Sequence, residues 1–318
     1  MSQQLRRLLA GFAALGLMAV IAVGCGDDKA DTASPGSDTP ASAKIEGSTI
    51  VIGTQDFPES ELLGQVYGQA LTNAGYSVEY KKLGGFRDLV LAAFDSGEIS
   101  FTPEYAASLL ETVNENAGEA SGDIDATFEK LTAALKPLDL TALTPSPAAD
   151  SNGLAVTKET SESKGLTKIS QLTADLKLGG PQNCKENPFC IPGLQRVYDV
   201  DLSASFTPLD GGGPLTVKAL SGGEIDVAVL FTTSAAAKPN GFVFLQDDKS
   251  LFNADNITPV VANATATEYG NDMVTLVNKI SAAMTTEKLL AMNDQFENEK
   301  LDAAEVAATF LKDNGLLK

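Results

Sequence analysis

Apolar and polar positions in residues 48–144 alternate between strand-like and helix-like periods. Residues 48–54 (STIVIGT) form an apolar run typical of a buried strand, and residues 56–75 carry apolar side chains at helical spacing. Asp56 and Glu59 have the spacing of a capping box, which predicts that they cap this helix. The pattern continues with strands at 76–83, 99–103 and 138–144 and helices at 84–98, 104–114 and 123–136. This order predicts an α/β fold on an open, parallel-type sheet with helices on both faces.

A second series of elements follows the Pro- and Ser-containing stretch 144–153, which is typical of a crossing segment. Strands are expected at 154–159, 176–180, 205–210, 225–231, 242–246 and 257–262, and helices near 193–199, at 214–221 and, at the C-terminus, at about 268–284, 285–298 and 302–314. Residues 86–103 and 213–230 share a Gly-rich turn, an apolar helix, a GEI sequence and a strand. This similarity is either ordinary α/β sequence or a sign of two like lobes. In the second case both turns point at a shared cleft, because ligands bind at the carboxyl ends of strands.

The first 47 residues differ from the rest of the chain. Arg6 and Arg7 precede an apolar run that ends in AVGC at Cys25, which predicts an export signal or, alternatively, an uncleaved membrane anchor. AVGC resembles a bacterial lipobox, in which Cys25 becomes the lipidated first residue. Residues 26–47 are small, polar and acidic, and they predict a flexible tether. We therefore expect residues 1–25 to be a lipoprotein signal peptide and the protein to be lipid-anchored at the extracytoplasmic face of the cell membrane.

Cys184 and Cys190 lie in a loop rich in Pro and Gly, and a zinc site, a redox pair and a structural disulfide are the three interpretations. A structural zinc site takes four ligands, and this chain has no His. The C-x5-C spacing also differs from the C-x-x-C of redox enzymes. Thiols oxidise outside the cytosol, and lipidation of Cys25 leaves these two cysteines as a pair. We predict a Cys184–Cys190 disulfide.

The composition excludes several classes of function. The formal net charge is −19, and Arg87 and Arg196 are the only arginines after residue 25, so no basic patch can meet nucleic acid. Without His there is no Ser-His or Cys-His pair, and SESK at 161–164 lacks the KTG partner of S-x-x-K hydrolases. GGG at 211–213 lacks the Lys of a phosphate loop. We predict no enzymatic activity, no cofactor, no metal, and a solvated acidic surface.

Seven stretches follow one another between residues 48 and 318: IVIGTQDFPESELLGQVYGQAL, SGEISFTPEYAASLL, GLTKISQL, CIPGLQRVYDV, LDGGGPLTVKAL, GEIDVAVLFTTS and LQDDKSLFNADNITPVV. In order and spacing they resemble the glycine betaine/choline/carnitine-binding proteins of ABC importers. The resemblance implies the type II periplasmic-binding-protein architecture: two lobes, crossing hinge strands and a C-terminal helical segment. Such a protein, here a monomer, closes on a solute and delivers it to a permease driven by an ATPase. Applied to this chain, lobe one is 48–152 plus 232–318, lobe two is 153–231, and the hinge lies near Asn152 and Phe231–Thr233.

The resemblance also implies ligand-binding residues. The family holds quaternary ammonium groups in a cage of aromatic rings by cation–π attraction, and Tyr105 and Phe231 correspond to cage positions. Arg87 lies at a turn-to-helix junction, where it either faces the cleft or pairs at the surface with Asp88 or Glu98. The full expected set is Gln55, Arg87, Tyr105, Asn152, Gly213, Phe231 and Thr232.

Three positions depart from the family pattern. Gly153 and Val217 stand near positions where further cage rings are usual, and Asn187 stands where an Arg often meets the solute carboxylate. We expect a compatible solute such as glycine betaine or choline. The alternatives are an importer protein for a solute that is not a quaternary amine, or a sensor or adhesive lipoprotein on the same fold.

Overall fold

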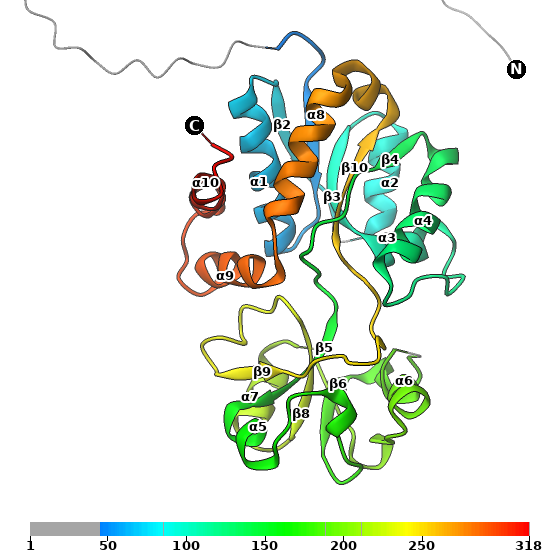
Figure 1. Cartoon of the computed structure of the whole chain (residues 1–318), viewed down its shortest axis with the longest axis vertical. Coiled ribbons are helices and arrows are strands. Elements are labelled where there is room, and N and C mark those ends of the chain that lie inside the picture. Colours follow the sequence, from blue (N-terminus) through cyan, green and yellow to red (C-terminus); the bar gives the residue numbers. More distant parts are fainter. Residues whose placement is uncertain (1–44, 85, 188, 211, 318) are drawn as a thin grey trace, which may run out of the picture. The chain divides into compact units, whose positions relative to one another are not determined.

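The computed structural model describes residues 45–84, 86–187, 189–210 and 212–317 (Figure 1). Two five-stranded sheets covered by helices form the two lobes of an α/β fold, which confirms the predicted fold class. The expected signal peptide with Cys25, and all but the last residues of the expected tether, lie outside the described residues.

The first sheet has the strand order β2-β1-β3-β10-β4. Its strands are β1 (Ile50–Thr54), β2 (Val78–Lys82), β3 (Phe101–Tyr105), β4 (Leu140–Ala142) and β10 (Ile257–Ala262). β1 pairs in parallel with β2 and β3, whereas β10 is antiparallel to both β3 and β4. The strands for which the α/β order predicts a parallel-type sheet, β1, β2 and β3, are parallel as expected, and β10 joins them as an antiparallel strand. This strand arrives from the other sheet rather than through a helical crossover, so it enters in the opposite direction.

Helices cover both faces of the first sheet. They are α1 (Pro58–Ala74), α2 (Arg87–Asp95), α3 (Ala106–Val113), α4 (Ile124–Leu135), α8 (Asn263–Ala283), α9 (Thr286–Glu297) and α10 (Ala303–Asp313). Val261 faces a core shared with α1, α8, α9 and α10, while its neighbour Val260 faces the core under α3 and α4. Opposite directions of successive side chains explain why the strand reads as a continuous apolar run.

The second sheet has the order β7-β6-β8-β5-β9. Its elements are β5 (Asn152–Thr157), α5 (Lys158–Lys164), β6 (Leu178–Pro181), α6 (Ile191–Gly193) with the π-helical turn Leu194–Tyr198, β7 (Thr207–Leu209), α7 (Pro214–Ser221), β8 (Val227–Phe231) and β9 (Phe242–Phe244). The pattern did not predict α5, because its side chains are polar throughout. The Thr157 hydroxyl caps its first turn by accepting a hydrogen bond from the Thr160 amide, and Gly165 ends it at φ 68°.

The two sheets share one plan. In each, three parallel strands are followed by an antiparallel strand that has just crossed from the other half, which is β10 in the first sheet and β5 in the second. The similar segments of the sequence become α2–β3 and α7–β8, and both units supply the third strand of their sheet. This confirms two lobes of like architecture. It also puts Tyr105 and Phe231 at equivalent places, because each is the last residue of that strand.

The structure corrects the predicted second lobe boundary and hinge. β9 pairs with β5 through Val156 and Val243, and Leu251 and Phe252 belong to the second sheet's core. Residues 242–252 therefore belong with the second sheet, because their apolar side chains complete its core, and not with the first as predicted. The chain crosses back at 253–256 instead of at 231–233. There the Asp150 amide donates to the Asp255 carbonyl at 3.0 Å, so the two crossing segments run together (Figure 1).

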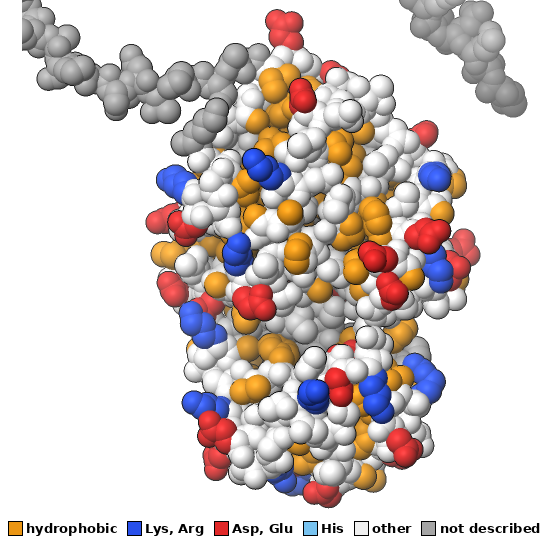
Figure 2. All heavy atoms as spheres, viewed as in Figure 1, with side chains coloured by type: hydrophobic (Ala, Val, Ile, Leu, Met, Phe, Trp, Pro, Cys, Tyr) orange, Lys and Arg blue, Asp and Glu red, His pale blue; other side chains and the backbone are white. Residues whose placement is uncertain are grey.

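Cys184 and Cys190 form the predicted disulfide, with Cα atoms 5.2 Å apart, and both sulfurs belong to the second sheet's core. Acidic and basic side chains are dispersed over the face in Figure 2, as expected of a solvated surface. Within the part of the chain that the structure describes, no helix has the length and apolar character needed to cross a membrane.

Candidate functional site

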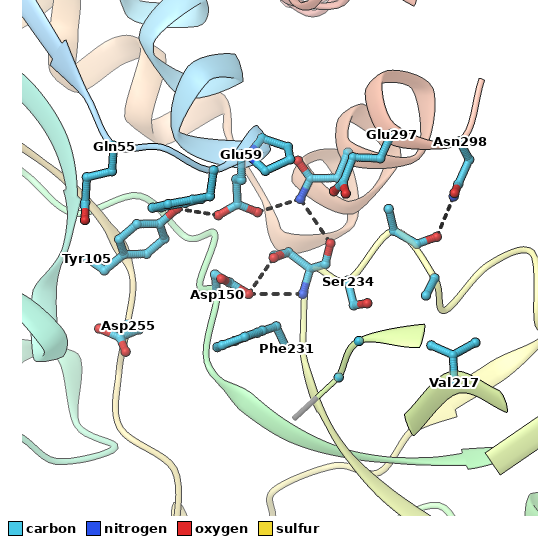
Figure 3. Close-up of a pocket in the computed structure, with 18 of the residues that line it drawn as sticks. Gln55, Glu59, Tyr105, Asp150, Val217, Phe231, Ser234, Asp255, Glu297 and Asn298 are labelled. Atoms are coloured by element: carbon cyan, nitrogen blue, oxygen red, sulfur yellow. Dashed lines mark hydrogen bonds between the residues drawn. The ribbon is translucent and has the colours of Figure 1, made fainter. Parts of the chain in front are cut away.

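A cavity of about 870 Å³ opens where the carboxyl ends of β1, β3 and β8 approach α9 (Figure 3). It is reached by both crossing segments and by the first turn of α7. Its lining residues are Gln55, Phe57, Pro58, Glu59, Arg87, Tyr105, Ser108, Asp150, Gly212, Gly213, Pro214, Val217, Phe231, Thr233, Ser234, Ala235, Ala236, Asp255, Asn293, Glu297 and Asn298. Because both halves of the chain supply this wall, the cavity is where a solute would be held between two lobes.

Five of the seven predicted ligand-binding residues line this cavity: Gln55, Arg87, Tyr105, Gly213 and Phe231. Asn152 and Thr232 do not, and they line a separate cavity of about 290 Å³ instead. Thr232 is turned toward the first crossing segment, where its hydroxyl accepts from the Ser151 amide at 3.1 Å and donates to the Ala149 carbonyl at 2.9 Å. Successive residues of an extended chain point to opposite sides, so Phe231 and Thr232 cannot both face the main cavity.

Three aromatic rings border the cavity. Tyr105 is buried and packs against Phe57, with ring centroids 6.1 Å apart, and Phe231 is half exposed on the opposite side (Figure 3). Phe57 was not predicted as a site residue, although it follows the first strand within two residues of Gln55. The wall therefore offers one more ring than the sequence indicated.

The positions that depart from the family pattern supply no further ring or cation. At Gly153 an added Cβ would meet the Thr232 side chain at 3.0 Å and Phe244 at 3.1 Å, so a larger side chain there would crowd both. Val217 lines the cavity with a short apolar side chain. Asn187 is not among the lining residues, and its Oδ1 accepts from the Phe189 amide at 2.9 Å.

Glu59 does not cap α1, which corrects the capping-box prediction. The N-cap of α1 is Phe57, without a side-chain cap, and the Glu59 side chain turns into the site. Its Oε1 accepts from the Tyr105 hydroxyl at 2.7 Å, and its Oε2 accepts from Asn293 Nδ2 at 2.5 Å. The same Nδ2 donates to the Thr233 carbonyl at 3.0 Å, and the Thr233 hydroxyl donates to Asp150. One network thus joins β3, α1 and α9 to the start of the β8–β9 connection and to a crossing segment (Figure 3).

Arg87 lines the cavity and is not the surface residue of the alternative interpretation. Its Nε donates to Oε2 of Glu104 at 2.9 Å, and the Glu104 side chain is fully buried behind it. The guanidinium carbon lies 5.7 Å from the centroid of the Tyr105 ring. The positive charge of Arg87 is therefore paired with Glu104 through Nε, while its terminal nitrogens make no hydrogen bond with a described residue.

Four carboxyl groups line the cavity: Glu59, Asp150, Asp255 and Glu297. Burial raises the pKa of Glu59 and of Asp255. Burial, followed by the charge of Glu59, raises the pKa of Asp150 to about 8. Burial and the same charge also raise the pKa of Glu297. Ionisation of these crowded carboxyl groups therefore costs solvation and repulsion, and a cation in the cavity would reduce that cost.

None of these carboxylates is predicted as a site residue, because three of them have an ordinary local explanation in the sequence. Glu59 looked like a helix cap, Asp150 belonged to a polar crossing segment, and Glu297 lay on an amphipathic helix. The usable signal was the position of Asp150 in a segment predicted to cross between lobes.

Comparison with known proteins agrees with this geometry. Residues 48–313 match the model of the family described as the substrate-binding domain of the ABC-type glycine betaine transport system. The chain belongs to this family. It is 26% identical over 286 residues to the glycine betaine-binding protein YehZ of Escherichia coli K12, covering 85% of this chain and 92% of that protein. A glycine-betaine-binding protein of Pseudomonas aeruginosa is 25% identical over 297 residues, covering 87% and 91%.

Solved structures show the same fold. A glycine betaine/carnitine/choline ABC transporter structure aligns with a TM-score of 0.76 and 20% identity, over 85% of this chain and all of that one. Membership of the family confirms the predicted role as a substrate-binding protein of an ABC importer, acting outside the cytoplasm with a permease.

Proposed function

We propose that the cavity captures a small solute with a quaternary ammonium group, such as glycine betaine or choline, for delivery to the permease. The observation that carries this proposal is the combination of Phe57, Tyr105 and Phe231 with four lining carboxyl groups. Aromatic faces attract a cation that keeps its methyl groups in apolar contact, and carboxylates balance its charge. The names of the relatives point to the same class of solute.

The solute is held by closure about the two crossing segments, 148–151 and 253–256. This is the revised form of the predicted hinge. The connection 232–241 between β8 and β9 limits the motion because it is tied to α9. Asn298 Nδ2 donates to the Ala235 carbonyl at 2.6 Å, and Lys238 pairs with Asp294 at 2.5 Å.

Anchoring completes the proposed role. Residues 1–25 act as the signal peptide, Cys25 carries the lipid, and residues 26–47 tether a monomeric binding protein to the outer face of the membrane. The protein performs no catalysis in this role, and it needs neither metal nor cofactor.

Isothermal titration calorimetry with glycine betaine and choline tests the proposed solute class. Tyr105→Ala should weaken binding of either solute by about tenfold or more, since a desolvated cation–π contact contributes about 2 kcal/mol. Tyr80→Ala is the matched control, because Tyr80 lies on the edge strand β2, is 44% exposed and does not line the cavity. If neither solute binds, the proposed solute class is wrong.

A further inference from the structure

The polar groups of the cavity wall are unequally available to a solute. Most of the side-chain hydrogen-bond donors already donate to acceptors within the protein. These donors and their acceptors are Gln55 to Glu104, Tyr105 to Glu59, Ser108 to Asp255, Thr233 to Asp150, Asn293 to Glu59, and Asn298 to the Ala235 carbonyl. The Ser234 hydroxyl and the terminal nitrogens of Arg87 are the lining side-chain donors without a described acceptor, so a solute that must accept hydrogen bonds finds few partners here.

Acceptors, in contrast, remain free on the same wall. Glu297 lines the cavity and makes no hydrogen bond or close ion pair with any described residue, although the charge of Lys300 acts on it (Figure 3). The amide orientation of Gln55 is set by its Nε2 bond to Glu104, which leaves Oε1 as an acceptor without a described partner. These two groups face the cavity from α9 and from the end of β1.

The charged groups of the lining also favour a cation over a carboxylate. Four carboxyl groups line the cavity, and Arg87 is the single Lys or Arg among the described lining residues. Arg87 is paired with buried Glu104, and Asp255 also lines the wall near it. A solute carboxylate would lie among four carboxyl groups and would share the one lining cation, Arg87, with Glu104, which is unfavourable at short range.

Resting on the proposed function, we infer that this cavity selects a cation that donates hydrogen bonds and carries no carboxylate, and that Glu297 determines this preference. An ammonium alcohol has these properties: its positive head contacts the rings and its hydroxyl donates to Glu297 or Gln55. A zwitterion such as glycine betaine has no donor and adds a negative charge.

Calorimetry with four probes tests this inference. Choline has a cationic head and one hydroxyl, tetramethylammonium lacks the hydroxyl, glycine betaine replaces it with a carboxylate, and ethanolamine lacks the methyl groups. We expect choline to bind at least about tenfold more tightly than both tetramethylammonium and glycine betaine. Equal affinities of choline and tetramethylammonium, or glycine betaine binding as tightly as choline, would overturn the inference while leaving the proposed function standing. Binding of ethanolamine alone would overturn the proposed quaternary ammonium class but support the preference for a donor.

Variants of Glu297 locate the preference. Glu297→Gln should reduce the affinity for choline about tenfold and bring it closer to the affinity for glycine betaine. Glu297→Lys should reverse the preference by supplying an uncompensated cation. Glu299→Gln, an exposed residue two positions further on, should change neither affinity. An unchanged ratio of the two affinities in Glu297→Lys, with the far-ultraviolet spectrum retained, would show that Glu297 does not determine the preference.

Discussion

Asp150 should make the empty protein less stable as the pH rises toward 8. It lies on the first crossing segment, and its pKa is raised from 3.8 to about 8 by burial and by the nearby charge of Glu59. Between these values the folded protein keeps a proton that the unfolded chain has lost. Stability contributed by this group is therefore fully present below pH 3.8 and is lost as the pH rises through about 8.

The size of the effect follows from the linkage between proton binding and folding. One proton held in the folded state alone changes the free energy of unfolding by about 1.4 kcal/mol per pH unit. From about pH 5 to about pH 8 the loss attributable to Asp150 approaches 4 kcal/mol. Asp150→Asn removes the titrating group and keeps an oxygen to accept the Thr233 hydrogen bonds, so its stability should not fall in this way.

Urea unfolding followed by far-ultraviolet circular dichroism measures the difference, since the chain has no Trp for fluorescence. The free energy of unfolding of the wild type, minus that of Asp150→Asn, should decline steadily as the pH rises. Asp88→Asn changes an exposed carboxyl on α2, and its free energy of unfolding should depend on pH as that of the wild type does. A difference in the free energy of unfolding between wild type and Asp150→Asn that does not vary with pH would show that Asp150 does not hold this proton.

The same proton should be linked to solute binding. A cation near Asp150 favours its ionised form, so binding should release a proton below pH 8. Affinity for choline should then rise with pH by up to about tenfold per unit between pH 6 and 8, and calorimetry in buffers of different ionisation enthalpy should detect the released proton. In Asp150→Asn the proton release should fall.

Three further predictions concern the rest of the molecule. Replacing both Cys184 and Cys190 by Ala should lower the free energy of unfolding by about 2 kcal/mol on the chain-entropy model, and a midpoint in urea equal to that of the wild type would contradict it. Cys25→Ser should leave the precursor unprocessed or release the protein from the membrane fraction, whereas an unchanged acylated product would argue against the lipid anchor. Small-angle scattering should show a smaller radius of gyration when saturating choline or glycine betaine is added, and an unchanged radius would count against hinge closure.

Most of the helices and strands and much of their order can be predicted from the sequence. Helical and strand periods depend on which side chains share a face within a few residues, so they located α1, α7 and β10 to within a few positions. The repeated turn–helix–strand segment placed Tyr105 and Phe231 at equivalent strand ends, and both line the cavity. The disulfide followed from the redox environment implied by the export signal.

The sheet that β9 joins and the contacts between polar groups depend on long-range packing. Nothing local to Phe242–Phe244 specifies that it pairs with β5, because pairing is chosen by the core it completes. Glu59 has the spacing of a capping residue, yet it is bound by Asn293, 234 positions away. The charge of the cavity, the pKa of Asp150 and the free carboxylate of Glu297 all arise from such long-range approach. Only the packed chain brings these carboxyl groups close enough to repel one another when ionised and to favour binding of a cation.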